Sequence, residues 1–459
     1  MTPCRERHEG RGAPAESPNG VLQGACGHCG PCHVLPASSK PSDLALVGHF
    51  APDRREERVT RSALEYGSFN RKQISGDFGG ALTDDGVWSW RLTGLKRDSD
   101  TFIDSTRDDR TYIAPALKWQ PNATTSLTFL SEYQHDKANW IAGLPLEGTV
   151  LSNPNGQLPR SRFAGIPGYD GYDNKKWSVG YLFEHAINDD LKLRHSLRYF
   201  NARHTFGAVY LGTYDTTNWR TMSGRSTEDW PEERTDVAVS DTSLAYRWSA
   251  AGIDHTSLFG MDYTWWKWKS TRYYGRTATD IDIYSSGSYG SVSGDPSYVS
   301  MWNDTTKQLG FYIQDQMKFA NRWVLTLGGR HDRVHHTSDS ASGDPSSPDR
   351  SYADEHDSAT TGRAGLVYLA DNGLAPFISF SQSFQPQAGM DRTGGRFKPT
   401  RGEQKEVGIR YQPEGSSTLL TATAYDLVQT NVTVTDPVDQ NSSIQQGKVR
   451  SRGLELGKR

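Results

Sequence analysis

The sequence lacks the long hydrophobic run that a membrane-spanning helix needs. Its 459 residues contain no stretch of about eighteen or more apolar residues, so we predict no transmembrane helix. Hydrophobic residues make up 35% of the chain, a low share for a packed soluble protein of this size. A transmembrane β-barrel is compatible with both observations, because its strands alternate apolar and polar residues instead of forming a continuous apolar run.

The chain also lacks a strong excess of charge, a visible signal peptide and cysteines beyond its first part. The net charge is −3, so no basic field indicates binding to nucleic acid. The charged start MTPCRERHEG is not followed by an apolar segment, so no signal peptide is recognisable. All four cysteines lie within residues 4–32, and the rest of the chain therefore folds without disulfides.

Three of these cysteines have the spacing C-x-x-C-x-x-C, at Cys26, Cys29 and Cys32, beside His28 and His33. Such spacings occur in zinc and iron–sulfur sites. No fourth well-spaced cysteine follows, and the surrounding residues show no periodicity that predicts a fold. We therefore predict no metal site and no resident cofactor.

Aromatic residues are abundant, with 13 Trp and 21 Tyr, and most lie in segments of alternating hydropathy. Residues 1–58 are rich in Gly, Pro, Ser and charge and are predicted to be irregular. The period of two begins near Thr60 and continues to the end, so residues 59–459 are predicted to form an all-β domain. About sixteen strands of about ten residues are expected, the length that crosses a bilayer at a tilt. The strands are predicted at 61–67, 72–82, 87–97, 110–119, 125–135, 175–185, 190–201, 235–247, 256–268, 306–319, 322–333, 361–369, 375–382, 403–411, 418–429 and 446–455.

The connections between these strands alternate between short turns and long polar segments. Alternate connections of a meander lie at the same end of the sheet, so one end should carry tight turns and the other long loops. Outer-membrane barrels have this layout, whereas a soluble sandwich has no physical reason to sort its loops by length. The short turns are 83–86, 120–124, 187–190, 320–321, 370–374 and 412–417, and the long segments are 136–174, 202–234, 269–305, 334–360 and 383–402.

The two faces of the predicted strands differ in polarity. In LKLRHSLRYF, leucines at 191, 193 and 197 alternate with Lys192, Arg194 and Arg198. A face this charged cannot pack as a core, so it must contact water. The alternation predicts lipid on the leucine side and a wet barrel interior on the arginine side. His195 and Asp315 fall on the apolar side and are expected near an interface or facing a neighbouring loop; the alternative is that the assigned alternation is locally wrong.

Eight segments between residues 66 and 457 carry more specific sequence patterns. They include YGSFNRKQISGDFGGAL (66–82), WSWRLTGLKRDSDTF (88–102) and FYIQDQMKFANRWVLTLGGRHD (311–332). Together, and in this order over roughly residues 60–459, they resemble TonB-dependent siderophore receptors of the ferrichrome-receptor type. The other five segments lie at 112–136, 373–386, 397–415, 424–437 and 445–457.

This resemblance implies a barrel of about 22 antiparallel strands that encloses an N-terminal plug. It implies a receptor in the outer membrane of a Gram-negative bacterium that imports ferric siderophores with energy delivered by a partner, TonB. Outer-membrane lipid would surround a monomeric barrel, and iron would enter only as cargo within the siderophore.

The sequence departs from this family pattern at both ends. Residues 1–58 contain no recognisable TonB box or complete plug, although GPCHVLPASSKPSDLALVGHF (30–50) partly resembles a plug tail after a frameshift. The final residues GLELGKR stop about six strands short of the family barrel. We therefore interpret the fold as a partial transmembrane β-barrel that is truncated at its C-terminus, and we expect no energised transport by this chain alone.

The candidate ligand-binding residues are aromatic side chains in or beside the long polar segments. Hydroxamate and catecholate complexes of iron are compact and partly apolar, so aromatic rims with a few donors suit them. We select Tyr210, Tyr214 and Trp266 as siderophore-binding residues. Arg194, Arg198 and Arg330 face the predicted interior, where they could attract anionic ligands, although pairing with acidic neighbours is the expected role. The three Trp at 265, 266 and 268 also fit an aromatic girdle at a membrane edge.

Motifs of catalysis are absent from the sequence: no nucleophile elbow, P-loop or H-E-x-x-H occurs, and the chain is not predicted to be an enzyme. Two other functions stay open. A passive sixteen-strand pore would require the first and last strands to pair, and single-channel conductance would detect it. A secreted β-rich carbohydrate-binding protein would instead need two sheets packed around a buried core.

Overall fold

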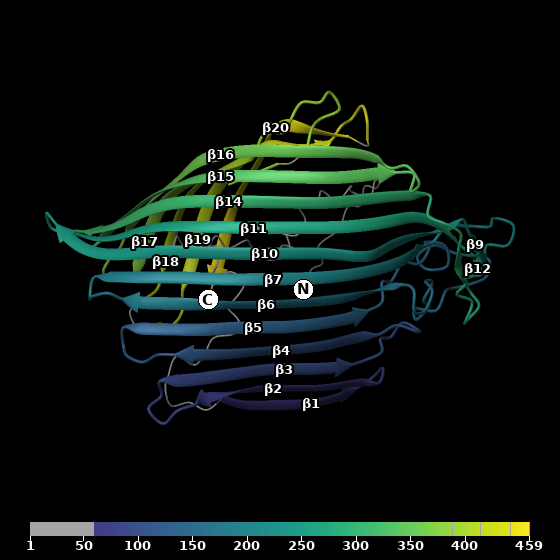
Figure 1. Ribbon diagram of the computed structural model, residues 1–459, viewed down its shortest axis with the longest axis horizontal. Helices are drawn as coiled ribbons and strands as arrows, with labels where there is room; N and C mark the ends of the chain where they lie inside the picture. Colours follow the sequence, from purple (N-terminus) through teal and green to yellow (C-terminus); the bar gives the residue numbers. More distant parts are fainter. Residues whose placement is uncertain (1–58, 388, 414, 441, 459) are drawn as a thin grey trace. The chain divides into compact units, whose positions relative to one another are not determined.

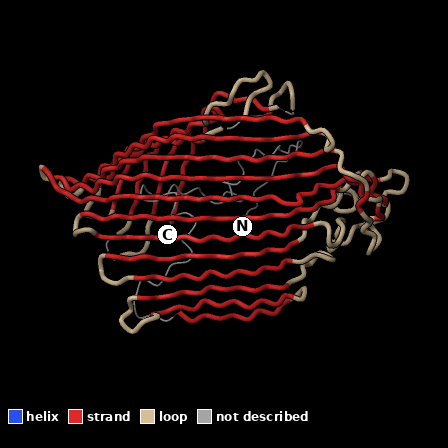
Figure 2. Tube along the Cα trace, in the orientation of Figure 1, coloured by secondary structure: helices blue, strands red, loops and turns tan. Residues whose placement is uncertain are grey.

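The computed structural model describes residues 59–458 except 388, 414 and 441. Within this range every regular element is a β-strand (Figure 2). No described helix has the length and hydropathy to cross a membrane. The predictions for residues 1–58, including the C-x-x-C-x-x-C segment, lie outside the described residues.

Sixteen long strands and four strands of two or three residues make up the described part of the chain. The four short ones are β8, β9, β12 and β13, and all others have at least nine residues. The strands are β1 Val59–Gly67, β2 Arg71–Ala81, β3 Trp88–Asp98, β4 Asp108–Trp119, β5 Thr125–Ala138, β6 Gly171–Ala186, β7 Leu191–Tyr210, β8 Thr213–Tyr214, β9 Thr221–Ser223, β10 Arg225–Ala250, β11 Ile253–Ala278, β12 Ile281–Asp282, β13 Val292–Ser293, β14 Tyr298–Phe319, β15 Trp323–Gly343, β16 Asp349–Tyr368, β17 Leu374–Gln385, β18 Thr400–Tyr411, β19 Leu420–Thr435 and β20 Ser443–Lys458.

The long strands form one antiparallel meander. Each pairs with the next long strand in the chain, from β1 with β2 to β19 with β20, in a 17-stranded sheet that also includes β13 (Figure 1). Among the described strands, no pairing joins β1 to β20. Strands β8, β9 and β12 form a separate small sheet beyond the ends of the long strands. The predicted number of sixteen strands and their order are therefore confirmed.

The predicted strand length was wrong for the middle of the sheet. Strands β10 and β11 each have 26 residues, and β14 has 22. At about 3.3 Å per residue, 26 residues extend roughly 85 Å, several times the height of a membrane's apolar band. The hydropathy alternation ends at the membrane edge, whereas the backbone ladder continues in polar sequence. Segment 334–360, expected as a long loop, is instead a paired hairpin with a connection at residues 344–348.

The two faces of the sheet differ as the alternation predicts. On β14, Phe311 and Ile313 point outward from the sheet and are each 52% exposed. Between them, Tyr312 faces the other side and donates a hydrogen bond of 2.7 Å to Asp241 of β10. Large exposed apolar side chains are unfavourable in water but not in lipid. The sheet therefore has one apolar and one hydrogen-bonded polar surface, which fits a barrel wall between lipid and water.

An aromatic belt lies beside the tight turns. Trp88 and Trp119, next to the β2–β3 and β4–β5 turns, have ring centres 6.3 Å apart. Near the β14–β15 turn, Trp323 lies 6.4 Å from Phe319 and 4.8 Å from Tyr368. Rings with an apolar body and a polar tip favour the boundary between lipid and water. The belt marks the turn-bearing edge of the apolar band.

The two polar exceptions on the apolar face both have hydrogen-bond partners on neighbouring strands. His195 Nδ1 lies 2.8 Å from the hydroxyl of Thr242. Asp315 Oδ2 lies 2.7 Å from His255 Nδ1, and Asp315 also accepts a 3.0 Å bond from Ser257. Neighbouring strands, and not a loop, therefore provide these partners of the two polar groups.

The carbohydrate-binding alternative required two large sheets around a common core. The structure has a single large sheet, so this expectation was wrong. The described buried apolar residues that form a cluster lie in the loops and in the small sheet, around Leu158, Met222 and Ile283. The pore alternative required β1 to pair with β20. No such pairing occurs among the described strands, so the structure does not support a closed pore.

Two glycines in the tight turns provide a matched test of backbone packing. Gly373 and Gly415 both have positive φ, at +83° and +74°. A Cβ atom at Gly373 would lie 2.1 Å from the carbonyl oxygen of Gln412, whereas a Cβ at Gly415 meets nothing within 4 Å. Both Ala variants carry the cost of positive φ, about 1–2 kcal/mol. We expect Gly373→Ala to lower the free energy of unfolding by roughly 1–3 kcal/mol more than Gly415→Ala, measured by urea titration in detergent. Equal losses would contradict the close approach of the two turns.

Candidate ligand-binding surface

The polar face of the sheet carries a set of paired charges. Arg194 lies 2.8 Å from Glu184, and Arg198 lies 2.7 Å from Glu132. Arg330 forms ion pairs with Asp262 and Asp332. The expectation that these three arginines pair with acidic neighbours is therefore confirmed, and their charges are compensated within the wall.

Aromatic side chains gather where β7 and β10 extend beyond this charged region. Phe206 and Tyr210 alternate with outward residues on β7, and the ring of Phe206 lies 4.8 Å from Trp230 of β10. Trp140, from the β5–β6 loop, lies 5.2 Å from Tyr210 and 6.2 Å from Phe206, with both ring pairs edge to face. Such pairs favour a fixed arrangement of rings. The loop thus completes an aromatic patch that begins on the strands.

Arg272 of β11 joins this patch to a second group of rings. Its guanidinium carbon lies 3.8 Å from the ring centre of Trp230, 5.4 Å from Trp302 and 5.9 Å from Trp268. Glu233 holds the guanidinium at 2.9 Å. A cation above indole faces is attracted by the ring quadrupole, so Arg272 fixes the position of three indoles.

The second group consists of three indoles. Trp266 stacks near Trp268 with ring centres 6.5 Å apart, and Trp268 stacks near Trp302 at 5.5 Å. Trp268 is 4% exposed, and its indole N–H has no hydrogen-bond partner among the described residues. A buried donor without a partner is costly, and an oxygen atom of a ligand would satisfy it. We use the name aromatic surface for Trp140, Phe206, Tyr210, Trp230, Trp266, Trp268, Trp302 and Arg272.

The structure brings two of the three predicted ligand residues onto this surface. Tyr210 contacts Trp140, and its hydroxyl donates to Glu228. Trp266 contacts Trp268, and it shares the polar face with Asp262 by alternation along β11. Trp265 therefore has the opposite orientation, as predicted.

Tyr214 does not lie on the aromatic surface; it belongs to β8 of the small sheet. Its hydroxyl donates a 2.9 Å hydrogen bond to the carbonyl of Glu147, and its ring packs against the cluster around Met222 and Ile283. Burial raises the pKa of Tyr214 to about 12, so the hydroxyl stays protonated at neutral pH. The structure does not bring Tyr214 together with Tyr210 and Trp266.

Sequence reasoning missed Trp230, Trp302 and Arg272. All three lie in segments expected as long loops, 202–234 and 269–305, where no face was assigned. The structure places them on β10, β14 and β11. For Arg272 the signal was present as continued alternation, since even numbers of residues separate it from Trp266 and Trp268.

A cavity of about 760 Å³ lies beside the same strand ends, between the sheet and the loops. Its lining carries three cationic and four anionic side chains: Arg107, Lys137, Arg276, Asp170, Asp173, Asp229 and Asp295. None of Tyr210, Tyr214 and Trp266 lines this cavity. Because the charges of both signs are nearly equal in number, the lining provides no strong preference for an ionic ligand of one sign.

Asp170 anchors the β5–β6 loop to the sheet. Its carboxylate accepts hydrogen bonds from the backbone N–H of Ile166 at 2.6 Å and of Val209 at 2.7 Å, and the residue is 2% exposed. Burial raises the pKa of Asp170 to about 6, although the two N–H donors and nearby Arg225 oppose this shift. The loop that carries Trp140 is therefore held by a carboxyl group that titrates near neutrality.

Acidification is expected to stabilise the folded chain through Asp170. Between a pH of about 6 and a pH of about 4, the carboxyl group of Asp170 is protonated in the folded chain but ionised in the unfolded chain. Its contribution to stability therefore increases as the pH falls from 7.5 to 5, by roughly 1.4 kcal/mol. Urea titrations at the two pH values should show this gain in the unmodified chain and not in Asp170→Asn. The loop variant Asp215→Asn is the control, since a hydrogen bond from Thr217 lowers the pKa of Asp215 out of this window. An unchanged gain in Asp170→Asn would exclude Asp170 as the cause.

The antiparallel meander, its apolar outer face, its charged inner face and the aromatic belt define a class: the wall of a transmembrane β-barrel. Residues 118–458 match the family described as "TonB dependent receptor-like, beta-barrel", and the chain belongs to this family.

Curated relatives include siderophore receptors. The "Ferrichrome outer membrane transporter/phage receptor" of Escherichia coli is 30% identical over 461 residues, covering 93% of this chain and 59% of that protein. The "Ferrioxamine B receptor" of Salmonella typhimurium is 31% identical over 434 residues, with the same coverage of 93% and 59%. The chain thus spans about three fifths of the length of these relatives.

Solved structures with the same fold also include those of siderophore receptors. The ferric-catecholate import receptor Fiu of Escherichia coli, in its closed form, superposes with a TM-score of 0.75 at 20% identity, over 88% of this chain and 62% of that one. The pyoverdine receptor FpvA of Pseudomonas aeruginosa gives a TM-score of 0.73 at 19% identity, over 88% and 59%. At these identities the similarity establishes the fold, and it supports the prediction of a partial barrel.

Proposed function

We propose that this chain forms the wall of an outer-membrane receptor that binds a ferric siderophore on its aromatic surface. Membership of the TonB-dependent receptor family and the functions of the relatives support this proposal. Uptake would take place together with TonB as the energising partner. Iron is the cargo of this process, carried within the siderophore.

The observation that carries the proposal is the arrangement around Arg272. Trp230, Trp268 and Trp302 surround its guanidinium on the polar face, and Glu233 holds it in place. Ferric hydroxamate complexes present apolar linkers and an outer layer of oxygen atoms. Ring faces suit the linkers, and the unpartnered indole N–H of Trp268 suits an oxygen acceptor. Tyr210 and Trp266 extend this surface at its two ends.

Binding of ferric ferrioxamine B and ferrichrome to the full-length chain in detergent tests the proposal. Quenching of tryptophan fluorescence reports the dissociation constant, because the surface contains five tryptophans: Trp140, Trp230, Trp266, Trp268 and Trp302. We expect Arg272→Ala to weaken binding by at least tenfold, since it releases three indoles from a common contact. Metal-free ferrioxamine B serves as the ligand control.

The matched control is Arg322→Ala. Arg322 is exposed beside a tight turn and pairs with Asp371. It lies at the opposite end of the strands from the aromatic surface, so binding should be unchanged. Equal affinity of Arg272→Ala and the unmodified chain, or no quenching by either ferric siderophore, would contradict the proposed site.

A further inference from the structure

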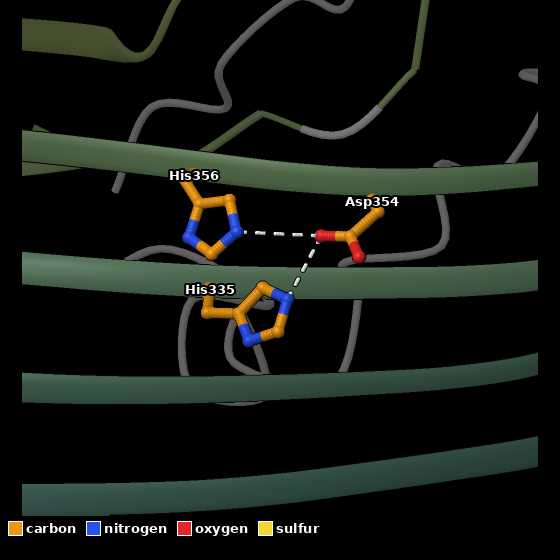
Figure 3. Close-up of side chains that lie close together, drawn as sticks. All are labelled: His335, Asp354 and His356. Carbon is orange, nitrogen blue, oxygen red and sulfur yellow. Dashed lines mark hydrogen bonds and ion pairs between the residues drawn. The ribbon is translucent and has the colours of Figure 1, made fainter.

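The extended hairpin of β15 and β16 carries three potential metal ligands side by side. His335 and His356 are direct cross-strand partners, and Asp354 precedes His356 by two residues on β16. A spacing of two residues keeps side chains on the same face of a strand. Figure 3 shows the carboxylate of Asp354 directed at the nitrogen atoms of both imidazoles.

The distances suit a common ion. Asp354 Oδ1 lies 2.9 Å from His335 Nε2 and 3.5 Å from His356 Nε2. All three ligand atoms lie within 4.8 Å of one another. In a tetrahedral zinc site with bonds of about 2.0–2.1 Å, ligand atoms are separated by about 3.3 Å. The observed separations lie on both sides of this value, so small side-chain rotations would bring the three atoms around one ion.

The two imidazoles are already aligned. Their ring centres are 4.2 Å apart with an angle of 7° between the planes. The hairpin ladder fixes both backbones, from Trp323 opposite Tyr368 to Ser342 opposite Asp349. Ligands on paired strands are held more accurately than ligands on loops, so little conformational entropy is lost on binding.

The site is open to solvent and lies outside the apolar band. The side chain of His356 is 73% exposed, which leaves room for water as a further ligand. Leu327, 44% exposed on the same face, lies eight residues before His335, roughly 26 Å along the strand. Lys307 of β14 pairs with His335 in register, and its positive charge lowers the affinity for a cation without blocking the three ligands.

We propose that His335, Asp354 and His356 bind a divalent transition metal ion of the zinc type. Two imidazoles and one carboxylate are ligands that such ions favour. Bound metal would add a cross-link between β15 and β16 in the part of β16 that does not pair with β17, since that pairing covers only Arg363–Val367. This site is separate from the aromatic surface and does not depend on the proposed receptor function. It goes beyond the sequence analysis, which predicted no metal site.

Calorimetric titration with zinc chloride tests the proposal. The full-length chain is used without a polyhistidine tag, in a background with Cys26, Cys29 and Cys32 replaced by serine, because these thiols would compete for zinc. We expect one zinc ion per chain. His335→Gln and His356→Gln should each weaken binding at least tenfold, and Asp354→Asn should weaken it to a smaller extent.

His331→Gln is the matched control. His331 lies four residues before His335 on the same face of β15, and its Nδ1 lies 2.9 Å from the Thr360 hydroxyl, without a carboxylate partner. This variant should bind zinc like the parent. Hydrogen exchange of residues 334–358 provides a second measurement, and zinc should slow it in the parent and in His331→Gln but not in His335→Gln. Zinc binding that is absent, or equal in all four variants, would overturn the proposal.

Discussion

Replacement of Ile313 by arginine should lower the free energy of unfolding in lipid vesicles by about 2–4 kcal/mol. Ile313 lies on the apolar face of β14 between the exposed Phe311 and the turn, and 52% of its surface is free of protein contacts. In a barrel wall this surface contacts acyl chains, where a guanidinium loses its hydration. Urea titration of the refolded chain, followed by tryptophan fluorescence, measures the change.

The control for this prediction lies three residues further along β14. Gln316 lies on the opposite, polar face of the strand and is exposed. Gln316→Arg should change the free energy of unfolding by less than about 0.5 kcal/mol, since water hydrates the new charge. Similar losses in the two variants would show that the outer face does not contact lipid.

Arg330→Ala is expected to destabilise the sheet by about 3–5 kcal/mol. Arg330 pairs with Asp262 on β11 and Asp332 on β15, and the side chain of Asp332 is 4% exposed. Removal of the guanidinium leaves a buried carboxylate without its counter-charge. The same urea titration reports the loss, and the heat required to unfold the chain in detergent provides an independent value.

Two further variants distinguish the cost of an uncompensated buried charge from the cost of losing the arginine side chain. Arg330→Ala combined with Asp332→Asn should recover part of the loss, because the uncompensated charge is then removed. Arg322→Ala breaks an exposed pair with Asp371 and should cost at most about 1 kcal/mol. If Arg330→Ala lowered the free energy of unfolding by no more than Arg322→Ala, water on the polar face would stabilise the carboxylates as well as the ion pairs do.

The number, order and orientation of the strands could be predicted because one physical rule governs them. A wall between lipid and water needs strict alternation, and that rule places Phe311, Ile313 and Trp266 on the correct faces from sequence alone. The tight turns could also be predicted, since positive φ at positions such as Gly373 favours glycine.

The ends of the strands could not be predicted, because backbone hydrogen bonds need no particular side chain. In 334–360 the sequence is polar on both faces, and only the ladder shows that β15 and β16 continue. Trp230, Trp302 and Arg272 were missed because they lie in 202–234 and 269–305, which were expected to be loops and were given no face. The pair His335 and His356, 21 residues apart in sequence, becomes visible only with the register of the hairpin.

The unbroken ladder of β15 and β16 also determines where this chain accepts changes of length. An insertion of one residue in a ladder turns every following side chain to the opposite face. Near Val334, such an insertion would separate His335 from His356 and bring the buried Val334 side into solvent. A peptide epitope inserted at residues 344–348 leaves the pairing of β15 with β16 intact. Hydropathy alone would predict that all of 334–360 tolerates insertion.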